Sequence, residues 1–284
     1  MLTQAVFQQA HELDRLAVQG RLLLSCEEPI FQHIFANRTG LRVLDIGCNN
    51  GQKTIQRFSH NAVARVIGLE FNEELARQAR ACCNSDKFSF YQCDVEAEDF
   101  SERLTQYMQE NAIAKFDVVY LSFLLMHLKR PEKLLRLLHG FLAEDGVLVV
   151  IEANDSASFL EPAGRARFDK FLEILRQDPY SGNREMGKEL TNMLRTCGFG
   201  DIRFWNEALA ASDQEREMKQ DIFTMFFSYL AEDVQLLRQQ DPKDARYLEW
   251  EAWLEENLQP LYEDIVRDGS VISMGMGILT CGRG

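Results

Sequence analysis

Three acidic side chains stand where successive apolar segments of the chain end, and they have the most evident capacity to bind a ligand. Asp45 is next to last in the first segment, Glu70 ends the second, and Asp94 directly follows the third. An acid at the tip of a strand can accept hydrogen bonds from both hydroxyls of a ribose. A dinucleotide carries an anionic pyrophosphate and gains little from three carboxylates. The pattern therefore favours a ligand that combines an adenosine with a cationic centre.

The residues after Asp45 have the composition of a sharp turn that leads into a helix. Gly47 and Gly51 remove Cβ atoms from this turn, so that the backbone can approach a small ligand closely. The helix that follows presents unpaired N–H groups at its start. Asn49 lies between the two glycines, and asparagine tolerates left-handed backbone geometry better than most residues. We therefore expect the turn to keep its shape.

An alternation of strands and helices must position these acids. The pattern predicts strands over 41–46, 65–70, 88–93, 116–122 and 146–152, and helices over 52–59, 72–83, 101–111 and 131–143. This order implies a parallel sheet with helices on both faces, which binds ligands at the carboxyl ends of its strands. Further helices are predicted over 3–19, 27–36, 159–177 and 184–197, and further strands over 201–205 and 271–281.

The ordered set of motifs resembles the class I S-adenosylmethionine-dependent methyltransferases. Residues 45–51, Asp-Ile-Gly-Cys-Asn-Asn-Gly, are similar to the family's D-x-G-x-G-x-G loop, although Asn49 replaces the usual second glycine. Residues 116–123 and 144–151 are similar to the family's fourth-strand motif and to its turn into the fifth strand. The resemblance covers residues 40–206 and the last strand, and the whole set is far more specific than any single motif.

The resemblance implies an α/β fold with a doubly wound, mostly parallel, seven-stranded sheet whose last strand is antiparallel. It also implies S-adenosylmethionine as the cofactor, with Glu70 on the ribose and Asp94 near the adenine. The implied cofactor-binding residues all lie in the turn or at strand ends: Asp45, Gly47, Cys48, Asn49, Gly51, Glu70, Phe71, Asp94, Val95, Ser122 and Phe123. For Asp45, capping of the turn is the competing interpretation.

Residues for catalysis and for the acceptor are harder to find, because methyl transfer from a sulfonium mainly needs proximity and alignment. His127 follows the fourth predicted strand and could remove a proton from an acceptor. The competing interpretation is a histidine that bonds the backbone beneath the pocket. Arg21 and Tyr180, in the flanking segments, are candidates for the acceptor pocket, with surface or packing roles as the alternative.

Composition narrows the function further. The net charge of −13 is unfavourable for binding nucleic acid, which depends on Lys and Arg. Seven cysteines without a C-x-x-C motif, together with the lack of an apolar leader, predict a cytoplasmic protein. The histidines show no metal-ligand spacing, so we expect no metal site. No apolar stretch is long enough to span a membrane.

The segment between the last two predicted strands is larger than the minimal family fold requires. Residues 214–266 are predicted to be wholly helical, with a break near residues 241–242. This insertion either caps the substrate pocket or forms a homodimer interface, and its aromatic residues also fit simple packing on the core. The predicted organisation is an N-terminal helical segment, 1–40, a core of 41–213 and 267–284, and this insertion.

The leading hypothesis is a methyltransferase that acts on O, N or C of a small organic acceptor. The main alternative is a protein that binds S-adenosylmethionine or S-adenosylhomocysteine without transfer, as a regulator or partner subunit. A nicotinamide-dependent oxidoreductase is disfavoured because the turn lacks the third glycine of G-x-G-x-x-G. An RNA or protein methyltransferase is disfavoured by the acidic charge and by the predicted cap. The sequence does not identify the acceptor.

Overall fold

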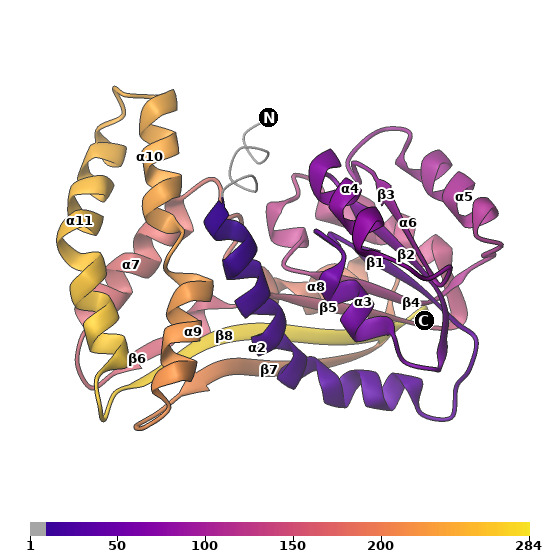
Figure 1. Ribbon diagram of the computed structural model, residues 1–284, viewed down its shortest axis with the longest axis horizontal. Coiled ribbons are helices and arrows are strands. Elements are labelled where there is room, and N and C mark those ends of the chain that lie inside the picture. The colour runs from indigo at the N-terminus through magenta and orange to yellow at the C-terminus, as the bar shows by residue number, and fades with distance from the viewer. Residues whose placement is uncertain (1–9) are drawn as a thin grey trace. The chain divides into compact units, whose positions relative to one another are not determined.

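The computed structural model describes residues 10–284, which form two compact units (Figure 1). The sheet unit comprises Cys26–Glu152, Met186–Asn206 and Gly277–Gly284. The helical unit comprises the described residues up to Ser25, together with Ala153–Glu185 and Glu207–Met276. The first predicted helix, over 3–19, begins outside the described residues.

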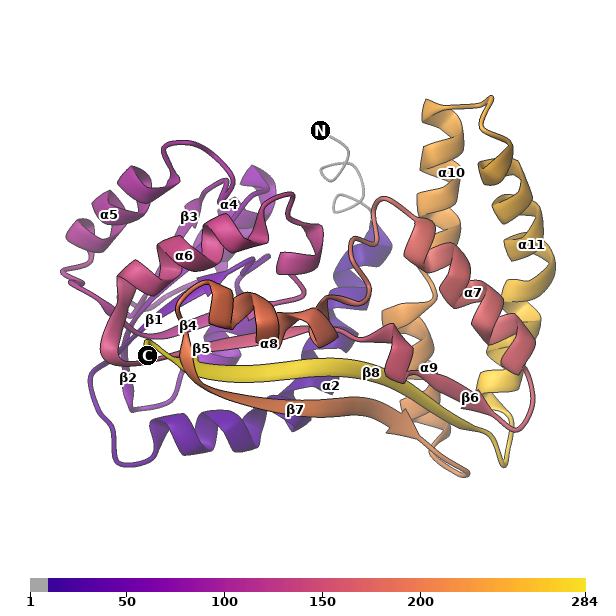
Figure 2. The same cartoon turned by 180° about the vertical axis from the view of Figure 1, so that it is seen from behind.

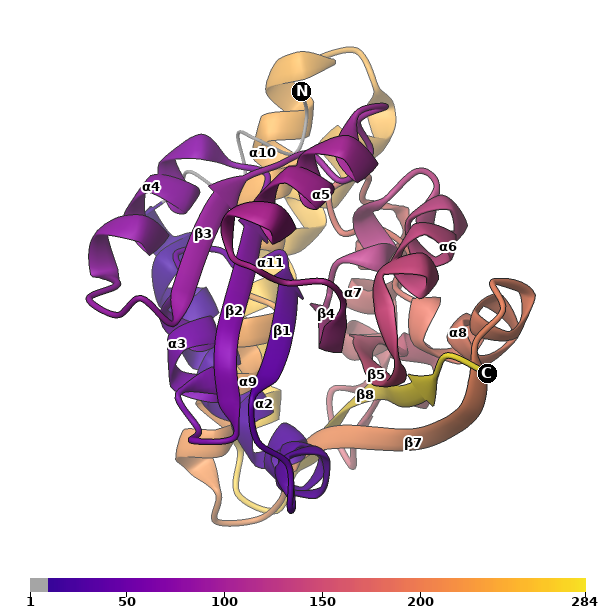
Figure 3. The same cartoon turned by 90° about the vertical axis from the view of Figure 1, so that its right-hand side faces the viewer.

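The sheet unit is built on parallel strands with their carboxyl ends at one edge (Figure 3). The strand order is β3-β2-β1-β4-β5-β8, with β7 also paired to β8. Each of the pairs β1–β2, β1–β4, β2–β3 and β4–β5 is parallel. The strands are β1 (Leu41–Ile46), β2 (Val63–Glu70), β3 (Phe88–Gln92), β4 (Phe116–Ser122), β5 (Leu142–Ala153), β7 (Gly200–Ala211) and β8 (Val271–Gly282). Strands β7 and β8 each contribute residues to both units.

Helices cover this sheet and explain why its central strands are apolar on both faces. Val43 and Leu44 of β1 are both fully buried, as expected for a strand covered on two sides. The helices of the unit are α3 (Gln52–Phe58), α4 (Glu73–Cys82), α5 (Phe100–Glu110), α6 (Pro131–Phe141) and α8 (Met186–Thr196), with the short η1 (Leu125–His127) after β4. The second half of α2 (Ala10–Phe35) also belongs to it.

The helical unit packs its helices around a cluster of aromatic side chains. Its further elements are η2 (Asp155–Ala157), β6 (Phe159–Glu161), α7 (Arg165–Gln177), α9 (Arg216–Phe226), α10 (Leu230–Gln240) and α11 (Ala245–Val266). The last two helices lie side by side (Figures 1 and 2). Phe227 is fully buried there, with its ring centroid 4.7 Å from that of Phe171 and 5.9 Å from that of Phe168.

The predicted fold class is confirmed, since the structure combines a mostly parallel sheet with helices and a last strand that pairs antiparallel. Among the described residues the sheet has eight strands, one more than predicted. The additional strand is β6, where a helix over 159–177 was predicted. Pro162 disfavours helical geometry at the preceding residue, so this segment is extended and pairs with the start of β8.

Two helical predictions were also wrong in detail. The predicted break between the helices 3–19 and 27–36 is absent, because the leucine-rich residues 20–26 continue α2. The insertion contains three helices instead of two. Helix α9 ends before Phe227, and the Ser228 hydroxyl donates to the Thr224 carbonyl oxygen at 2.7 Å. This side-chain bond competes with the backbone bonds of a continuing helix.

No helix within residues 10–284 is long and apolar enough to cross a membrane.

The aromatic cluster leads to a prediction about stability. Replacement of Phe227 by alanine leaves a cavity in the helical unit, so it should lower the free energy of unfolding by about 3–5 kcal/mol. The matched control is Phe159→Ala, because the Phe159 side chain is 45% exposed and loses little burial. Denaturant unfolding of both variants measures the difference. Equal losses in the two variants would contradict a core role for Phe227.

Candidate functional site

The turn after β1 adopts the left-handed geometry that its residues allow. Asn49 has φ of 51° and Gly51 has φ of 77°. The backbone N–H groups of Gly47 and Cys48 both donate to the Leu69 carbonyl oxygen, at 2.8 and 3.1 Å. The turn is therefore bonded to the end of β2. The expectation that Asn49 preserves the turn is confirmed.

Close packing beneath the turn requires glycine at two positions. A Cβ atom at Gly51 would lie 2.9 Å from the Ala79 Cβ atom of α4. A Cβ atom at Gly68 of β2 would lie 2.4 Å from the Phe90 ring. Both distances are shorter than Cβ contacts allow, so these glycines let β2, β3 and α4 approach the turn.

Glu70 closes the turn from the end of β2. Its Oε2 atom accepts the N–H of Asn49 and its Oε1 atom accepts the N–H of Asn72, each at 2.9 Å. Burial raises the pKa of Glu70, and these backbone hydrogen bonds oppose the rise. A carboxylate oxygen has two acceptor sites, so Glu70 can still accept hydrogen bonds from a ligand hydroxyl.

Asp45 lies almost wholly inside the fold, and its side chain is bonded to the helix that follows the turn. The carboxylate accepts the Thr54 hydroxyl at 2.6 Å. Burial raises the pKa of Asp45 to about 6, while the positive charge of Arg57 opposes the rise. Burial also raises the pKa of the Cys48 thiol, with further contributions from Asp45 and Glu70. The thiol is therefore neutral and is not a nucleophile.

A buried ion pair lies close to Asp45. Arg57, near the end of α3, donates from Nε to Glu27 Oε2 at 2.5 Å, and Glu27 comes from α2. The Tyr120 hydroxyl of β4 donates to the other oxygen of Glu27. The side chains of Arg57 and Glu27 are 4% and 1% exposed. Three elements distant in sequence thus meet around one buried carboxylate.

The ends of β2 and β3 carry the residues implied for the adenine. The Phe71 side chain is 39% exposed, which is unusual for a large apolar residue in this fold. The side-chain amide of Gln92 donates to the Phe71 carbonyl oxygen at 3.0 Å. Asp94 accepts the N–H of Glu96 at 2.8 Å, and Val95 between them is half-buried. An apolar surface and an acid therefore occur at adjacent strand ends.

The end of β4 is held in a strained conformation. Phe123, which follows Ser122, has φ of 50°, a value that costs a non-glycine residue about 1–3 kcal/mol. Its N–H donates to the Ile151 carbonyl oxygen of β5 at 2.8 Å. The fully buried Glu152 accepts the N–H of Leu125 at 2.6 Å and so fixes η1. This short helix carries the half-buried His127.

The structure brings the predicted cofactor residues and His127 into the sheet unit, at or next to the strand ends. Arg21 and Tyr180 belong to the helical unit. Arg21 is mainly exposed and donates to Asp221 at 2.6 Å. Tyr180 is buried, and its hydroxyl accepts a hydrogen bond from Gln240 at 2.7 Å. A role for either residue at an acceptor stays a prediction.

Several residues of the site were missed from sequence. They share burial and a polar side chain that is hydrogen-bonded within the sheet unit: Glu27, Thr54, Arg57, Asn72, Tyr120 and Glu152. Asn72 could have been found, because it precedes two glutamates at the start of a helix and its side chain caps α4. The others leave no local pattern.

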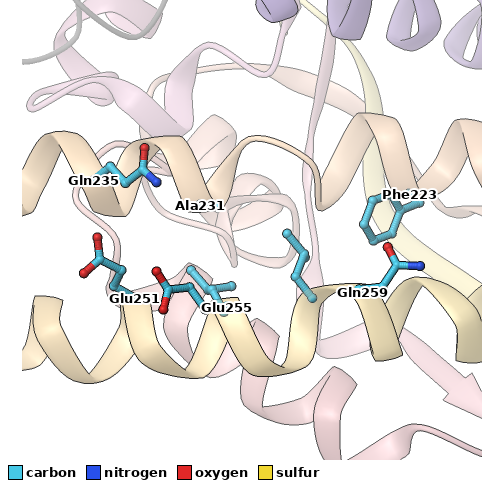
Figure 4. Close-up of a pocket in the computed structure, with 8 residues that line it drawn as sticks. Phe223, Ala231, Gln235, Glu251, Glu255 and Gln259 are labelled. Carbon is cyan, nitrogen blue, oxygen red and sulfur yellow. The ribbon is translucent and has the colours of Figure 1, made fainter.

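A cavity of about 330 Å³ lies within the helical unit (Figure 4). Its lining comes from three helices of the insertion and contains none of the predicted cofactor residues: Phe223, Ala231, Gln235, Glu251, Leu254, Glu255, Leu258 and Gln259. Throughout residues 10–284, no group of three or more His, Cys, Asp or Glu side chains is arranged to hold a metal ion.

Comparison with curated proteins finds methyltransferases. The chain is 23% identical over 193 residues to juvenile hormone acid O-methyltransferase of Bombyx mori, covering 66% of each protein. It is 26% identical over 156 residues to a ubiquinone biosynthesis O-methyltransferase of Glaesserella parasuis, covering 48% of this chain and 62% of that protein. The chain spans between 46% and 66% of the length of the curated relatives that it matches.

Comparison with solved structures agrees on the fold. The cyclase SpnF has a TM-score of 0.52 and 19% sequence identity, covering 89% of this chain and 79% of that one. A likeness at this identity shows the fold alone. The family model described as a methyltransferase domain matches residues 37–222. Since this match extends from before β1 into α9, the resemblance to class I S-adenosylmethionine-dependent methyltransferases is confirmed, and the chain belongs to the methyltransferase-domain family.

Proposed function

We propose that this protein transfers a methyl group from S-adenosylmethionine to a small organic acceptor by in-line displacement. The observation that carries the proposal is the pair of acids, the buried Asp45 and the half-buried Glu70, beside a turn of left-handed backbone geometry. The family match adds support, because it covers the turn and both acids. The acidic net charge of −13 further supports an acceptor other than nucleic acid.

The residues of the turn fit this cofactor in chemical type. We assign Glu70 to the ribose hydroxyls, because both of its oxygens keep an acceptor site. Phe71 offers an exposed aromatic face for the adenine, with Asp94 and Val95 next to it. Asp45 and the turn backbone are assigned to the methionine portion. When bound, the cofactor supplies an electrophilic methyl group on a sulfonium.

Electrostatics supports a cationic ligand at this position. Burial raises the pKa of both Asp45 and Glu70, and the charge of Asp45 raises the pKa of Glu70 further. A further positive charge nearby, in addition to that of Arg57, would therefore favour the ionised form of both acids. A ligand with an ammonium and a sulfonium provides that charge, whereas a dinucleotide would add negative charge.

Oxygen is the acceptor atom that the relatives support. The two curated relatives described above are both named O-methyltransferases, and the name of one specifies an acid as its acceptor. We propose that a hydroxyl acceptor needs His127 as its base, since it must lose a proton. A carboxylic acid acceptor is already ionised at neutral pH and needs no base. Ser122 and Phe123 are assigned to the wall near the methyl group.

A second candidate function is cofactor binding without methyl transfer. It is favoured by one observation, that a protein named a cyclase has the same fold. Asn49, which replaces the family's second glycine, fits either function. Formation of a methylated product distinguishes the two. A homodimer made through residues 214–266, and the cytoplasmic location, stay predictions.

Calorimetric titration of Glu70→Ala tests the cofactor site. The wild-type protein should bind S-adenosylmethionine and S-adenosylhomocysteine but not NAD. Loss of the Glu70 carboxylate removes the ribose acceptor and the partner of two backbone N–H groups, so affinity should fall about tenfold to a hundredfold. Glu74→Ala, which removes an exposed acid from α4, is the matched control and should bind normally. Binding of NAD instead would favour an oxidoreductase.

Methyl transfer to two classes of acceptor tests the role of His127. We expect His127→Asn to lower kcat for phenolic acceptors by about 10²–10⁴-fold, because proton removal loses its base. With apolar carboxylic acids, kcat should change little. Steady-state kinetics with a panel of both classes provides the measurement. Equal losses with both classes would show that His127 positions the acceptor and does not remove a proton.

A further inference from the structure

A buried group of charged side chains lies next to Asp45, and the family motifs do not account for it. We propose that Glu27, Arg57 and Tyr120 are positioning residues that set the charge on Asp45 and thereby couple helix α2 to cofactor binding. This inference rests on the cofactor site proposed above. None of the three residues belongs to the turn itself.

The geometry of the group is closed and specific. Both Nε and Nη2 of Arg57 contact the Oε2 atom of Glu27, and the Tyr120 hydroxyl occupies the Oε1 atom. The guanidinium carbon of Arg57 also lies 4.4 Å from the centroid of the Tyr120 ring. One arginine thus contacts both a carboxylate from α2 and an aromatic ring from β4. These contacts hold the guanidinium of Arg57, and therefore its positive charge, in one position.

The surroundings of the Arg57–Glu27 ion pair are apolar, so burying its two charges carries a large desolvation cost. The rings of Phe31 and Phe58 each have their centroid 5.9 Å from the guanidinium carbon of Arg57. Both rings are almost completely buried. Apolar side chains of similar volume often stabilise such a position as well as a buried ion pair does. A role beyond stability is therefore a reasonable explanation for the charges.

Two links connect this group to Asp45. In the sheet, Asp45 is the direct register partner of Tyr120. On α3, Thr54 lies three residues before Arg57 and donates its hydroxyl to Asp45 at 2.6 Å. The charge of Arg57 lowers the pKa of Asp45, whereas the charge of Glu27 raises it. The charges of Arg57 and Glu27 together therefore influence the pKa of Asp45, the acid beside the cofactor turn.

Other groups also act on the charge of Asp45. The positive charge of Lys53 on α3 lowers its pKa. Glu70 at the end of β2 and the Cys48 thiol in the turn also interact with it electrostatically. These groups remain unchanged when the buried pair is altered. A change in the titration of Asp45 can thus be assigned to the pair.

The test compares two variants that break the same ion pair but leave opposite charges. Glu27→Gln removes a negative charge, so Asp45 should ionise more readily. The acid limb of cofactor binding, where affinity falls as Asp45 becomes protonated, should then move to lower pH. Arg57→Met removes a positive charge, so that limb should move to higher pH. At a pH well below both midpoints, affinity relative to the plateau at high pH should differ about tenfold between the variants for each unit that separates their midpoints. Calorimetry with S-adenosylhomocysteine across pH measures both.

Two controls separate the effect of charge from an effect on structure. Glu28→Gln makes the same charge change on the exposed side of α2 and should bind as the wild type does. Arg57→Lys keeps the positive charge and should restore the wild-type midpoint, even where Arg57→Met folds poorly. Shifts of the same sign in Glu27→Gln and Arg57→Met, or no shift in either relative to Glu28→Gln, would overturn the proposal.

A second readout keeps this inference distinct from the proposed function. Titration of the Asp45 carboxyl carbon by NMR, assigned with Asp45→Asn, reports its charge without any ligand. Opposite shifts in the two variants support the charge coupling. If the wild type binds neither sulfur ligand, the proposed function fails and the link to cofactor binding falls with it. If it binds but Asp45 titrates identically in all variants, only the positioning role is overturned.

Discussion

Burial of the Asp45 carboxylate is the constraint on which the rest of the site depends. Strand β1 lies between β2 and β4, so the register places Asp45 between Gly68 and Tyr120, away from water. A buried carboxylate must find partners or become neutral. Thr54 provides a hydrogen bond, and Arg57 provides charge. Arg57 is itself buried, so its charge also needs a partner.

Glu27 provides the carboxylate that the buried Arg57 guanidinium needs as a partner. An unpaired guanidinium in an apolar core would be strongly destabilising, so a carboxylate must reach it. That carboxylate comes from α2, and its second oxygen is occupied by Tyr120. The second half of α2, which belongs to the sheet unit, is thus held by charged contacts as well as by its apolar face. A buried acid near the end of β1 therefore constrains residues on α3, β4 and α2.

The parts predicted from sequence are those encoded by local pattern. The strand ending at Ser122 was predicted with its observed bounds, because the apolar run 118–121 within it marks a strand covered on both faces. Glu70 was predicted to bind the ribose because its distance from the glycine turn is set by one βαβ unit. In contrast, Glu27 and Tyr120 are 93 residues apart and share no periodicity. Contacts of this kind follow from tertiary packing, which a single sequence does not specify.

The acceptor side was beyond prediction for a different physical reason. Recognition of a common cofactor uses backbone geometry, and residues such as Gly51 are required wherever that geometry occurs. Recognition of an acceptor uses side chains on helices, where many sequences satisfy the same packing. Tyr180 illustrates the difficulty, since its hydroxyl contacts Gln240 across 60 residues of chain. The identity of the cofactor can therefore be inferred from the spacing of residues in the sequence. The identity of the acceptor depends on side chains that follow no sequence motif.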